Sequence, residues 1–452
     1  MYEQIATALI RDIQSGKLKP GDLLPPNREL SASLGVTVGT VSRAFAVALR
    51  ANLIETGARR GTRVKAPAET VEVDQQDLPR ALERGIADLR GHQAAVKHWW
   101  GSLAQEMASL HSSPALGNLL RYDNPGGRLS HREVGAQWLG GREGRHVDPA
   151  KVVVTDGAQH ALLCALLACT KAGDRIATER LTYTGLKTAA SMLGLEVVPV
   201  DMDEEGMRSD SLRAALADGS VKAIVCVPNI HNPTTTTMSS ARRIEIAGIA
   251  EQSGVPILED DVYGYLTDAD LPSLASLAPD CTIRFTSFSK TLGPGLRVGF
   301  METPGRFTSA VIEAVRASTW MASPISAELA AKLVASGQAD QMLLENRMEL
   351  QRRNQALSEI LGARVQTTPY APHAWLTLPE PWTGRQFCSL AETMGYLVLS
   401  AEAFGVDGTA PVPAVRLSVS AAQDVDELNR FATLAAHSLR SGPRTPEQGL
   451  FA

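Results

Sequence analysis

Apolar positions near the start of the chain recur at helical spacing and are interrupted by turn residues. Ile5, Leu9 and Ile13 share one face of a predicted first helix. A glycine and a Lys-Pro-Gly-Asp turn end this helix. The same periodicity predicts two more short helices, one over residues 27–34 and one from about residue 37 to residue 49.

Two short strand-like runs follow the third helix. Residues 53–55 and 62–64 each suit a strand, and glycines and arginines fill the turn between them. The pair predicts a basic β-hairpin. Three helices followed by a basic hairpin are the element order of a winged helix-turn-helix, which is a DNA-binding arrangement.

Residues 152–300 alternate apolar strands with apolar helices. β-Branched runs at 152–154, 223–227 and 255–258 each lead into a turn or a polar residue. This alternation predicts an α/β fold with a mostly parallel sheet. A long helix expected after Pro324 and the segment from Leu361 onward would form a second, smaller domain.

The sequence predicts two folded regions joined by a tether. Prolines and a run of acidic residues after position 66 cannot bury a core, so this segment is expected to be extended or flexible. The predicted parts are a winged helix-turn-helix at 1–65, a linker at 66–85, a large body at 86–440 and a flexible tail at 441–452.

Charge is divided unevenly between the two regions. The first 66 residues hold ten Lys and Arg against five Asp and Glu, whereas the remainder holds 34 against 44. Attraction for a polyanion is therefore confined to the N-terminus. The sequence shows no signal peptide and no apolar run long enough to span a bilayer, so the cytoplasm is the expected location. Five scattered cysteines lack metal-ligand spacing, so no metal site is predicted.

The segment TSFSKTLGPGLRVGF surrounds Lys290 with reactive and anion-binding groups. Ser287 and Ser289 can donate hydrogen bonds to a phosphate ester, and Arg297 can grip it with a planar fork of donors. Neighbouring cations or desolvation would lower the pKa of Lys290 enough for its amine to condense with an aldehyde. The combination indicates pyridoxal 5'-phosphate; the alternative is a surface loop that happens to contain Lys and Ser.

Other segments place groups that suit the same cofactor after predicted strands. Ala158 and Gln159 open a helix after a glycine turn, where free N–H groups form an anion site. Asn232 follows a buried strand, at the end where open α/β sheets bind ligands. Asp260 is the preferred partner for a protonated pyridine nitrogen, which preserves the ring as an electron sink. Asp261 competes for that role, and the pattern leaves the pair nearly even.

These segments, in this order, resemble the fold-type I aminotransferases from about residue 86 to residue 439. The resemblance implies catalytic roles for Lys290 as the internal aldimine, Asp260 at the ring nitrogen and Tyr263 at the phenolic oxygen. The other site residues that it implies are Asn232 beside the phenolic oxygen and the substrate, the ring-stacking Tyr183, the phosphate-binding Ala158, Gln159, Ser287 and Arg297, and Arg416 for a substrate α-carboxylate.

Some positions depart from the aminotransferase pattern. Leu181 stands where relatives usually carry proline, and residues 88–93 differ from the loop expected on the substrate side, so the amino donor is left open. Tyr122 resembles the tyrosine that reaches the cofactor phosphate of the neighbouring subunit, which implies a homodimer. A core tyrosine beside a turn is the alternative for this residue.

Residues 2–65 resemble the GntR family of regulators through the stretches YEQI, KLKPGDLLP, REL, LGV and RGT. Val38 and Gly39 stand where relatives often carry arginine, so base readout is expected to rely more on apolar contacts or DNA shape. The DNA-contacting residues that the resemblance implies are Arg28, Thr37, Thr40 and Arg43, with Arg60 and Gly61 on the wing.

A GntR-type head joined to an aminotransferase-like body resembles the MocR subfamily of transcription regulators. The resemblance implies an operator DNA as partner and an amino acid or amine as effector, sensed through pyridoxal 5'-phosphate. The alternative is a working aminotransferase with an appended DNA-binding module. The regulator is preferred because a DNA-binding head has no use in transamination, and residual transaminase activity is compatible with it.

Overall fold

The structure is a computed structural model with two compact units, Met1–Asp77 and Leu78–Ala452. The expected first helix, linker and tail lie mostly outside its described residues, as does Arg60 of the expected wing. The residues that it describes are 2, 5, 9, 18, 19, 21–50, 54–57, 61–64, 86–92, 94, 95, 100–111, 116–267, 270–408, 410 and 412–443.

The N-terminal unit builds its core on one face of helix α3 (Val38–Arg50). Helix α2 (Asn27–Leu34) precedes it and has the predicted bounds. Gly35 ends α2 in the left-handed conformation at φ 66°, which glycine adopts without strain. Strands β1 (Ile54–Gly57) and β2 (Gly61–Val64) then pair antiparallel, as the hairpin prediction requires. The buried core of this unit consists of Leu24, Val41, Phe45, Ile54 and Val64.

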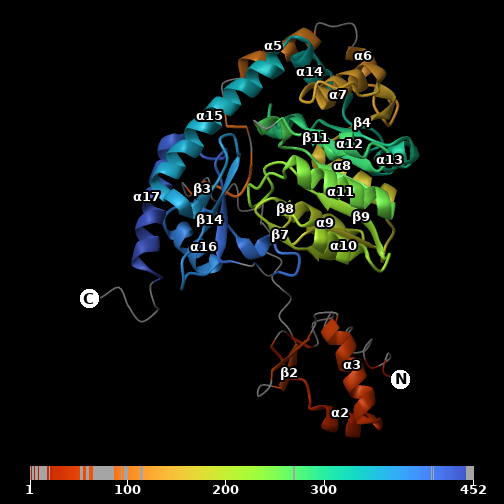
Figure 1. Cartoon of the computed structure of the whole chain (residues 1–452), viewed down its shortest axis with the longest axis vertical. Helices are drawn as coiled ribbons and strands as arrows, with labels where there is room; N and C mark the ends of the chain where they lie inside the picture. Colours follow the sequence, from red (N-terminus) through yellow and green to blue (C-terminus); the bar gives the residue numbers. More distant parts are fainter. Residues whose placement is uncertain are drawn as a thin grey trace. The chain divides into compact units, whose positions relative to one another are not determined.

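The large unit is organised around a seven-stranded sheet (Figure 1). The strand order is β4-β12-β11-β10-β9-β5-β6, in which β12 is antiparallel to both neighbours and the other pairs are parallel. The α/β fold with a mostly parallel sheet is thereby confirmed. The strands are β4 (Val152–Thr155), β5 (Arg175–Glu179), β6 (Glu196–Val200), β9 (Val221–Cys226), β10 (Ile257–Asp260), β11 (Thr282–Ser287) and β12 (Gly299–Glu302).

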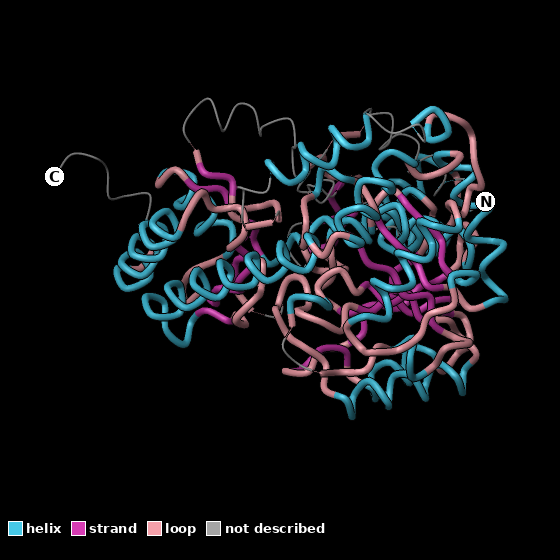
Figure 2. The backbone as a smooth tube through the Cα atoms, turned by 90° about the horizontal axis from the view of Figure 1, so that it is seen from above, coloured by secondary structure: helices cyan, strands magenta, loops and turns pink. Residues whose placement is uncertain are grey.

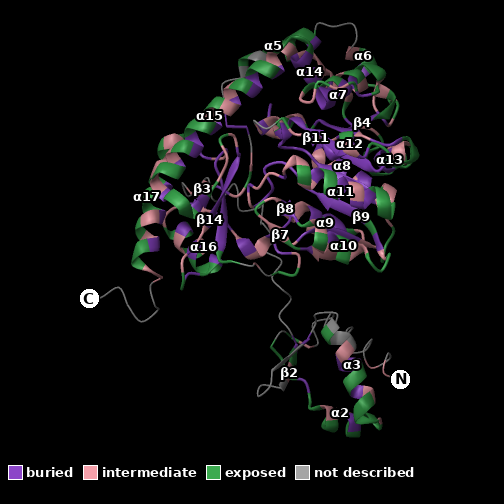
Figure 3. Cartoon of the chain, in the orientation of Figure 1, coloured by how far each residue is buried: buried purple, intermediate pink, exposed green. Residues whose placement is uncertain are grey.

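Helices cover both faces of this sheet (Figure 2). Val225 and Leu258 pack with one set of helices, whereas the adjacent Ile224 and Ile257 pack with another. Both faces are apolar because successive strand residues point to opposite sides, and Figure 3 shows the strands buried. One face carries α8 (Ala158–Cys169), α9 (Thr184–Met192) and α13 (Gly305–Thr319), and the other carries α10 (Ser209–Leu216), α11 (Ser240–Ser253) and α12 (Leu274–Leu277), with α7 (Leu129–Gly141) beside β4 and β12.

A smaller antiparallel sheet forms the second domain of the large unit. Its strand order is β13-β14-β17-β16, and α15, α16 and α17 bury apolar side chains against it. Its elements are β13 (Val365–Gln366), β14 (His373–Thr377), β16 (Leu399–Ser400), β17 (Ala414–Ser418), α15 (Gln338–Leu361), α16 (Gly384–Thr393) and α17 (Val425–Ser441).

The stretch after Pro324 contains the predicted long helix, α15, but a separate, shorter helix precedes it. Two helices occupy this stretch, α14 (Pro324–Ala335) and α15, because Gly337 adopts the left-handed conformation at φ 75° between them. The shorter elements of the unit are β3 (Ala87–Asp88), α5 (Trp100–His111), α6 (Leu116–Leu119), β7 (Met202–Asp203), β8 (Gly206–Met207) and β15 (Tyr396–Leu397). Among the helices described, none combines the length and apolarity needed to cross a bilayer.

Candidate cofactor and DNA-binding sites

Lys290 lies at the carboxyl edge of the large sheet, where neighbouring parallel strands end. Strand β11 ends at Ser287, and the 3₁₀ turn Phe288–Lys290 follows at once. The adjacent β10 ends at Asp260, and β9 leads into the loop that contains Asn232. Ligands of open α/β sheets bind at this edge, so the strand order gathers candidate residues that are far apart in the sequence.

Lys290 forms hydrogen bonds with two other segments, and its surroundings lower the pKa of its side chain. The ammonium donates a hydrogen bond to the backbone oxygen of His92 at 3.1 Å, and Asn346 donates its amide to the Lys290 backbone oxygen at 3.1 Å. Burial and then the Arg416 charge lower the pKa of Lys290 to about 8, while Asp260 acts in the opposite direction. The neutral, nucleophilic form of the amine is therefore more populated near neutral pH than that of an ordinary lysine, although the protonated form still predominates.

The adjacent carboxylates Asp260 and Asp261 have different partners. Asp261 accepts hydrogen bonds from Arg284 Nε at 2.9 Å and Nη2 at 2.6 Å, and from Asn229 at 2.5 Å. Burial acts to raise the Asp261 pKa, but the Arg284 charge and Arg142 hold it below its ordinary value. Asp260 accepts a hydrogen bond from the backbone N–H of Val262 at 3.3 Å. Burial raises the pKa of Asp260 to about 7, and the Asp261 charge adds to this rise.

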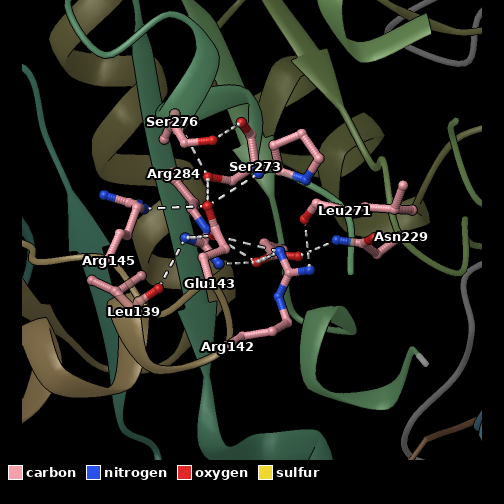
Figure 4. A network of polar contacts seen from close by, with 12 residues as sticks. Leu139, Arg142, Glu143, Arg145, Asn229, Leu271, Ser273, Ser276 and Arg284 are labelled. Atoms are coloured by element: carbon pink, nitrogen blue, oxygen red, sulfur yellow. Dashed lines mark hydrogen bonds and ion pairs between the residues drawn. The ribbon is translucent and has the colours of Figure 1, made fainter. Parts of the chain in front are cut away.

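The partners of Asp261 belong to a larger buried network (Figure 4). Arg284 also donates to Glu143 at 2.7 Å and to the backbone oxygen of Leu139 at 3.0 Å. Glu143 in turn accepts from the Ser273 hydroxyl at 2.9 Å. Through Arg284, Asp261 therefore helps to hold α7 against the sheet. Of the two adjacent carboxyl groups, Asp260 is the one without a charged hydrogen-bond partner among the described residues.

Arg416 of β17 brings the smaller domain into the site. Its Nη1 donates to Asn232 Oδ1 at 3.0 Å, its Nη2 donates to the Arg90 backbone oxygen, and its guanidinium lies 4.9 Å from the Phe404 ring centroid. Burial lowers the pKa of Arg416 to about 10. The hydroxyl of Tyr263 lies 3.3 Å from His92 Nδ1. Arg416 and Asn232 are therefore in direct contact, and Tyr263 lies close enough for the charge of Arg416 to affect its pKa.

Tyr183 immediately precedes α9 and interacts electrostatically with Asp260 and Arg416. Burial raises its pKa, the Asp260 charge adds to the rise, and the Arg416 and Arg297 charges oppose it. A Cβ on Gly185 would lie 2.4 Å from the Tyr183 ring and 2.3 Å from Gln159 Oε1. Gly185 is therefore required for the close approach of Tyr183 and Gln159.

The first turn of α8 and Arg297 form a cationic corner. Gly157, at φ 82°, precedes α8, and no side chain caps this helix. Its first N–H groups, from Ala158 and Gln159 onward, therefore suit an anion. Arg297, at φ 52°, donates from Nη2 to the Asp156 backbone oxygen at 2.9 Å, and a Cβ on Gly157 would approach this guanidinium to 2.8 Å. The corner fits a phosphate ester.

The chemistry of these donors fits pyridoxal 5'-phosphate in each of its parts. A half-buried lysine of lowered pKa suits the aldehyde, a carboxyl group at a strand end suits the ring nitrogen, and a helix N-terminus with an arginine suits the phosphate. Ser287 is buried at this edge and accepts from the backbone N–H of Ser289 at 3.4 Å.

Tyr122 lies apart from this cluster. Its side chain is 82% exposed, and its ring centroid is 5.5 Å from that of Trp320, which is also exposed. The alternative interpretation of Tyr122 as a core residue is therefore wrong for this chain.

Sequence reasoning missed His92, His373 and Asn346. The rings of His92 and His373 lie 4.8 Å apart beside Tyr263, and Asn346 accepts from the Ala95 backbone N–H at 2.8 Å while donating to Lys290. The only signal in the sequence was the unusual loop at 88–93, which contains His92.

The candidate DNA-binding surface is the exposed side of α3 with its neighbours. Arg28 and Arg43 are exposed, whereas Val41 and Phe45 on the opposite side of α3 are buried. Thr37 is exposed, but its hydroxyl accepts from the Thr40 backbone N–H at 3.2 Å and so caps α3.

Thr40 is half-buried, and its hydroxyl lies 2.9 Å from the Thr37 hydroxyl. Gly61 begins β2. Arg60 lies outside the described residues.

Comparison with known proteins matches both units. Residues 82–433 match the family described as aminotransferase class I and II, and residues 1–64 match the bacterial regulatory proteins of the gntR family. The uncharacterized HTH-type transcriptional regulator YdeF of Bacillus subtilis strain 168 is 31% identical over 432 residues, covering 95% of this chain and 92% of that protein. The vitamin B6 salvage pathway transcriptional repressor PtsJ of Salmonella typhimurium is 27% identical over 435 residues, covering 95% of this chain and 96% of that protein.

Among solved structures, an archaeal alanine:glyoxylate aminotransferase superposes with a TM-score of 0.75 at 25% sequence identity, covering 87% of this chain and 97% of that one. The fold of the large unit is that of fold-type I aminotransferases. With a GntR-type head and an aminotransferase-like body in one polypeptide, the chain belongs to the MocR subfamily of GntR-type regulators.

Proposed function

We propose that this protein is a DNA-binding transcription regulator that senses pyridoxal 5'-phosphate, or its adduct with an amino compound, in its aminotransferase-like unit. The observation that carries the proposal is one polypeptide with both a helix α3 that exposes Arg43 and a site in which Lys290 and the buried Asp260 interact. Such a regulator would act in the cytoplasm, where the chromosomal DNA that it binds is located.

In this proposal the chain's own residues bind and orient the cofactor. When bound, pyridoxal 5'-phosphate supplies an aldehyde that reacts reversibly with amines and a protonated ring that withdraws electrons. Lys290 provides the attaching amine, and Asp260 holds the proton on the ring nitrogen. The remaining proposed contacts are Tyr183 to the ring face, Asn232 and Tyr263 to the phenolic oxygen, and Ala158, Gln159, Ser287 and Arg297 to the phosphate. In a homodimer, Tyr122 of the second copy would complete the phosphate site.

Arg416 is proposed to recognise the carboxylate of an amino acid effector. It lies in the smaller domain and contacts Asn232 of the large one, so a ligand held there would touch both domains. Binding that shifts their relative position could alter DNA affinity without touching the N-terminal unit. Linkage then makes operator DNA change effector affinity by the same factor, typically about 5–150-fold for couplings of about 1–3 kcal/mol.

The test measures both halves of the proposal in the same samples. The full-length protein is loaded with pyridoxal 5'-phosphate and titrated with amino acids while its visible spectrum and its affinity for promoter DNA are recorded. We expect an amino acid that changes the spectrum to change DNA affinity as well. Identical DNA affinity with and without cofactor, and with every amine that changes the spectrum, would contradict the sensing role.

The observation that favours a second function is the completeness of the site. Lys290, Asp260, Tyr263 and Arg416 are all present at one place, so the large unit has the groups for transamination of an amino acid. An aminotransferase with an appended DNA-binding module would turn over amino acid and keto acid with no effect of either on DNA affinity. The same titration, with keto acid product measured, separates the two functions.

A further inference from the structure

The loop that leads into α8 is held by a histidine in the first turn of that helix. The backbone N–H of Asp156 donates a hydrogen bond to His160 Nδ1 at 3.1 Å. A backbone N–H can only donate, so Nδ1 is the acceptor, and the neutral ring carries its hydrogen on Nε2. His160 therefore reaches back by one helical turn to the residue before Gly157.

The contacts on the other side of the ring agree with this tautomer. His160 Nε2 lies 2.7 Å from the hydroxyl oxygen of Ser318 on α13. The Ser318 hydroxyl donates its proton to the Ala314 backbone oxygen at 2.7 Å, so its oxygen accepts from Nε2–H. Burial lowers the pKa of His160 below its ordinary value near 6.5, the Asp156 charge opposes this, and the Arg297 charge adds to it. The ring is therefore neutral at pH 8, with both nitrogens hydrogen-bonded.

This contact fixes the loop without using the N–H groups at the start of α8. At many helix N-termini the side chain of the N-cap residue accepts from these N–H groups. The N-cap residue of α8 is Gly157, which has no side chain to do so. The N–H that His160 accepts belongs to Asp156, which lies before the helix. The N–H groups of Ala158 and Gln159 therefore stay available to an anion.

Asp156 connects His160 to the cationic corner. His160 binds the N–H of Asp156, and the backbone oxygen of Asp156 accepts from Arg297 Nη2 at 2.9 Å. The Asp156 carboxylate accepts from the backbone N–H of Ser323 at 3.2 Å. The fit is close, because a Cβ on Gly157 would lie 2.8 Å from the Arg297 guanidinium. A change in the orientation of Asp156 would therefore move Arg297 relative to the start of α8.

We propose that His160 is a positioning residue for the phosphate group of pyridoxal 5'-phosphate. It holds Asp156 in the orientation in which Arg297 and the first N–H groups of α8 bind the same phosphate, and it acts through these groups without touching the phosphate itself. The proposal rests on the proposed function, which places the cofactor phosphate at this corner. Loss of the Nδ1 acceptor should therefore weaken binding of the phosphorylated cofactor more than binding of its unphosphorylated form.

The test compares the affinity of full-length protein, stripped of cofactor, for pyridoxal 5'-phosphate and for pyridoxal, which lacks the phosphate. Both dissociation constants are measured by absorbance titration at pH 8, and their ratio is the phosphate preference. Any difference in aldehyde reactivity between the two compounds is the same for every variant and cancels from the comparison. His160→Leu should lower the phosphate preference by about 2- to 12-fold, the effect of one net neutral hydrogen bond. If His160→Leu does not fold, His160→Ala takes its place.

Two further variants separate positioning from a general loss of stability. His160→Gln should keep the phosphate preference, because its amide oxygen can accept from the Asp156 N–H and its amide nitrogen can donate to Ser318. His131→Leu is the matched control. His131 is a buried histidine whose Nε2 lies 2.9 Å from Glu328, so its loss removes a comparable contact away from the cationic corner and should leave the preference unchanged.

An unchanged phosphate preference in the folded His160→Leu protein overturns the proposal. An equal loss of preference in His160→Gln or in His131→Leu also overturns it, because the loss would then not depend on the Nδ1 acceptor. A wild-type protein that binds pyridoxal as tightly as pyridoxal 5'-phosphate, or that binds neither, contradicts the cofactor site of the proposed function, and this outcome is distinct from the others because it is seen without any variant.

Discussion

Asp260→Asn and Asp261→Asn should change stability in opposite directions, although the two residues are adjacent. Asp261 neutralises Arg284, which is buried and donates to it at 2.9 Å and 2.6 Å. Breaking a buried ion pair from one side costs about 3–5 kcal/mol because it leaves an uncompensated charge. Glu143 still contacts Arg284 at 2.7 Å, so we expect the lower end of that range, about 3 kcal/mol.

Asp260→Asn is expected to have the opposite effect on the free energy of unfolding. Burial raises its folded-state pKa to about 7 from an ordinary value near 3.8, so the folded protein binds this proton more tightly than the unfolded chain. Its contribution to stability is complete below pH 3.8 and is lost as pH rises to about 7. At about 1.4 kcal/mol per unit, the ionised carboxylate opposes folding at pH 8 by on the order of 4 kcal/mol. Asparagine removes that charge, so Asp260→Asn should be neutral to stabilising.

The assay is urea unfolding of protein stripped of cofactor, followed by far-ultraviolet circular dichroism at pH 8 and pH 5. The midpoint of Asp261→Asn should fall at both pH values, whereas that of Asp260→Asn should not fall at pH 8, and its difference from wild type should shrink at pH 5. Affinity for pyridoxal 5'-phosphate, measured by absorbance, should be weakened more by Asp260→Asn. Equal destabilisation at pH 8, or a greater loss of cofactor affinity in folded Asp261→Asn, would refute the assignment.

Three further predictions test the remaining parts of the molecule. Borohydride reduction of the loaded protein should fix the pyridoxyl group on Lys290, and peptide mapping that finds the label on another lysine would contradict this. Because the pKa of this amine is lowered to about 8, attachment of added cofactor should become faster from pH 7 to pH 9. Arg43→Ala should weaken binding to all DNA sequences and reduce the salt dependence of log affinity by about one if Arg43 contacts a phosphate, whereas a change in sequence preference would assign it to base readout. Arg416→Ala should remove the spectral response to amino acids but not that to the corresponding amines without a carboxylate, and loss of both responses would place its role elsewhere.

Local patterns in the sequence were sufficient for much of the fold. The bounds of α2 follow from apolar periodicity and a terminal glycine, because a helix and its end depend on residues within a few positions of each other. Helix α8 begins directly after the glycine turn at Gly157, as its sequence indicates. The predicted long helix is α15, and the left-handed backbone of Gly337, which separates it from α14, is visible only in the structure.

The sequence by itself was enough to predict a reactive segment around Lys290, its serines and Arg297, because these groups lie within ten residues of one another. Only the tertiary structure shows that Asp260 and Asp261 have different partners. The parallel register pairs Glu259 with Arg284, and alternate strand residues share a face, so Asp261 falls on the Arg284 side and Asp260 on the other. The approach of His92 to Tyr263 and Lys290 likewise depends on contacts between segments far apart in the chain, which no local spacing encodes.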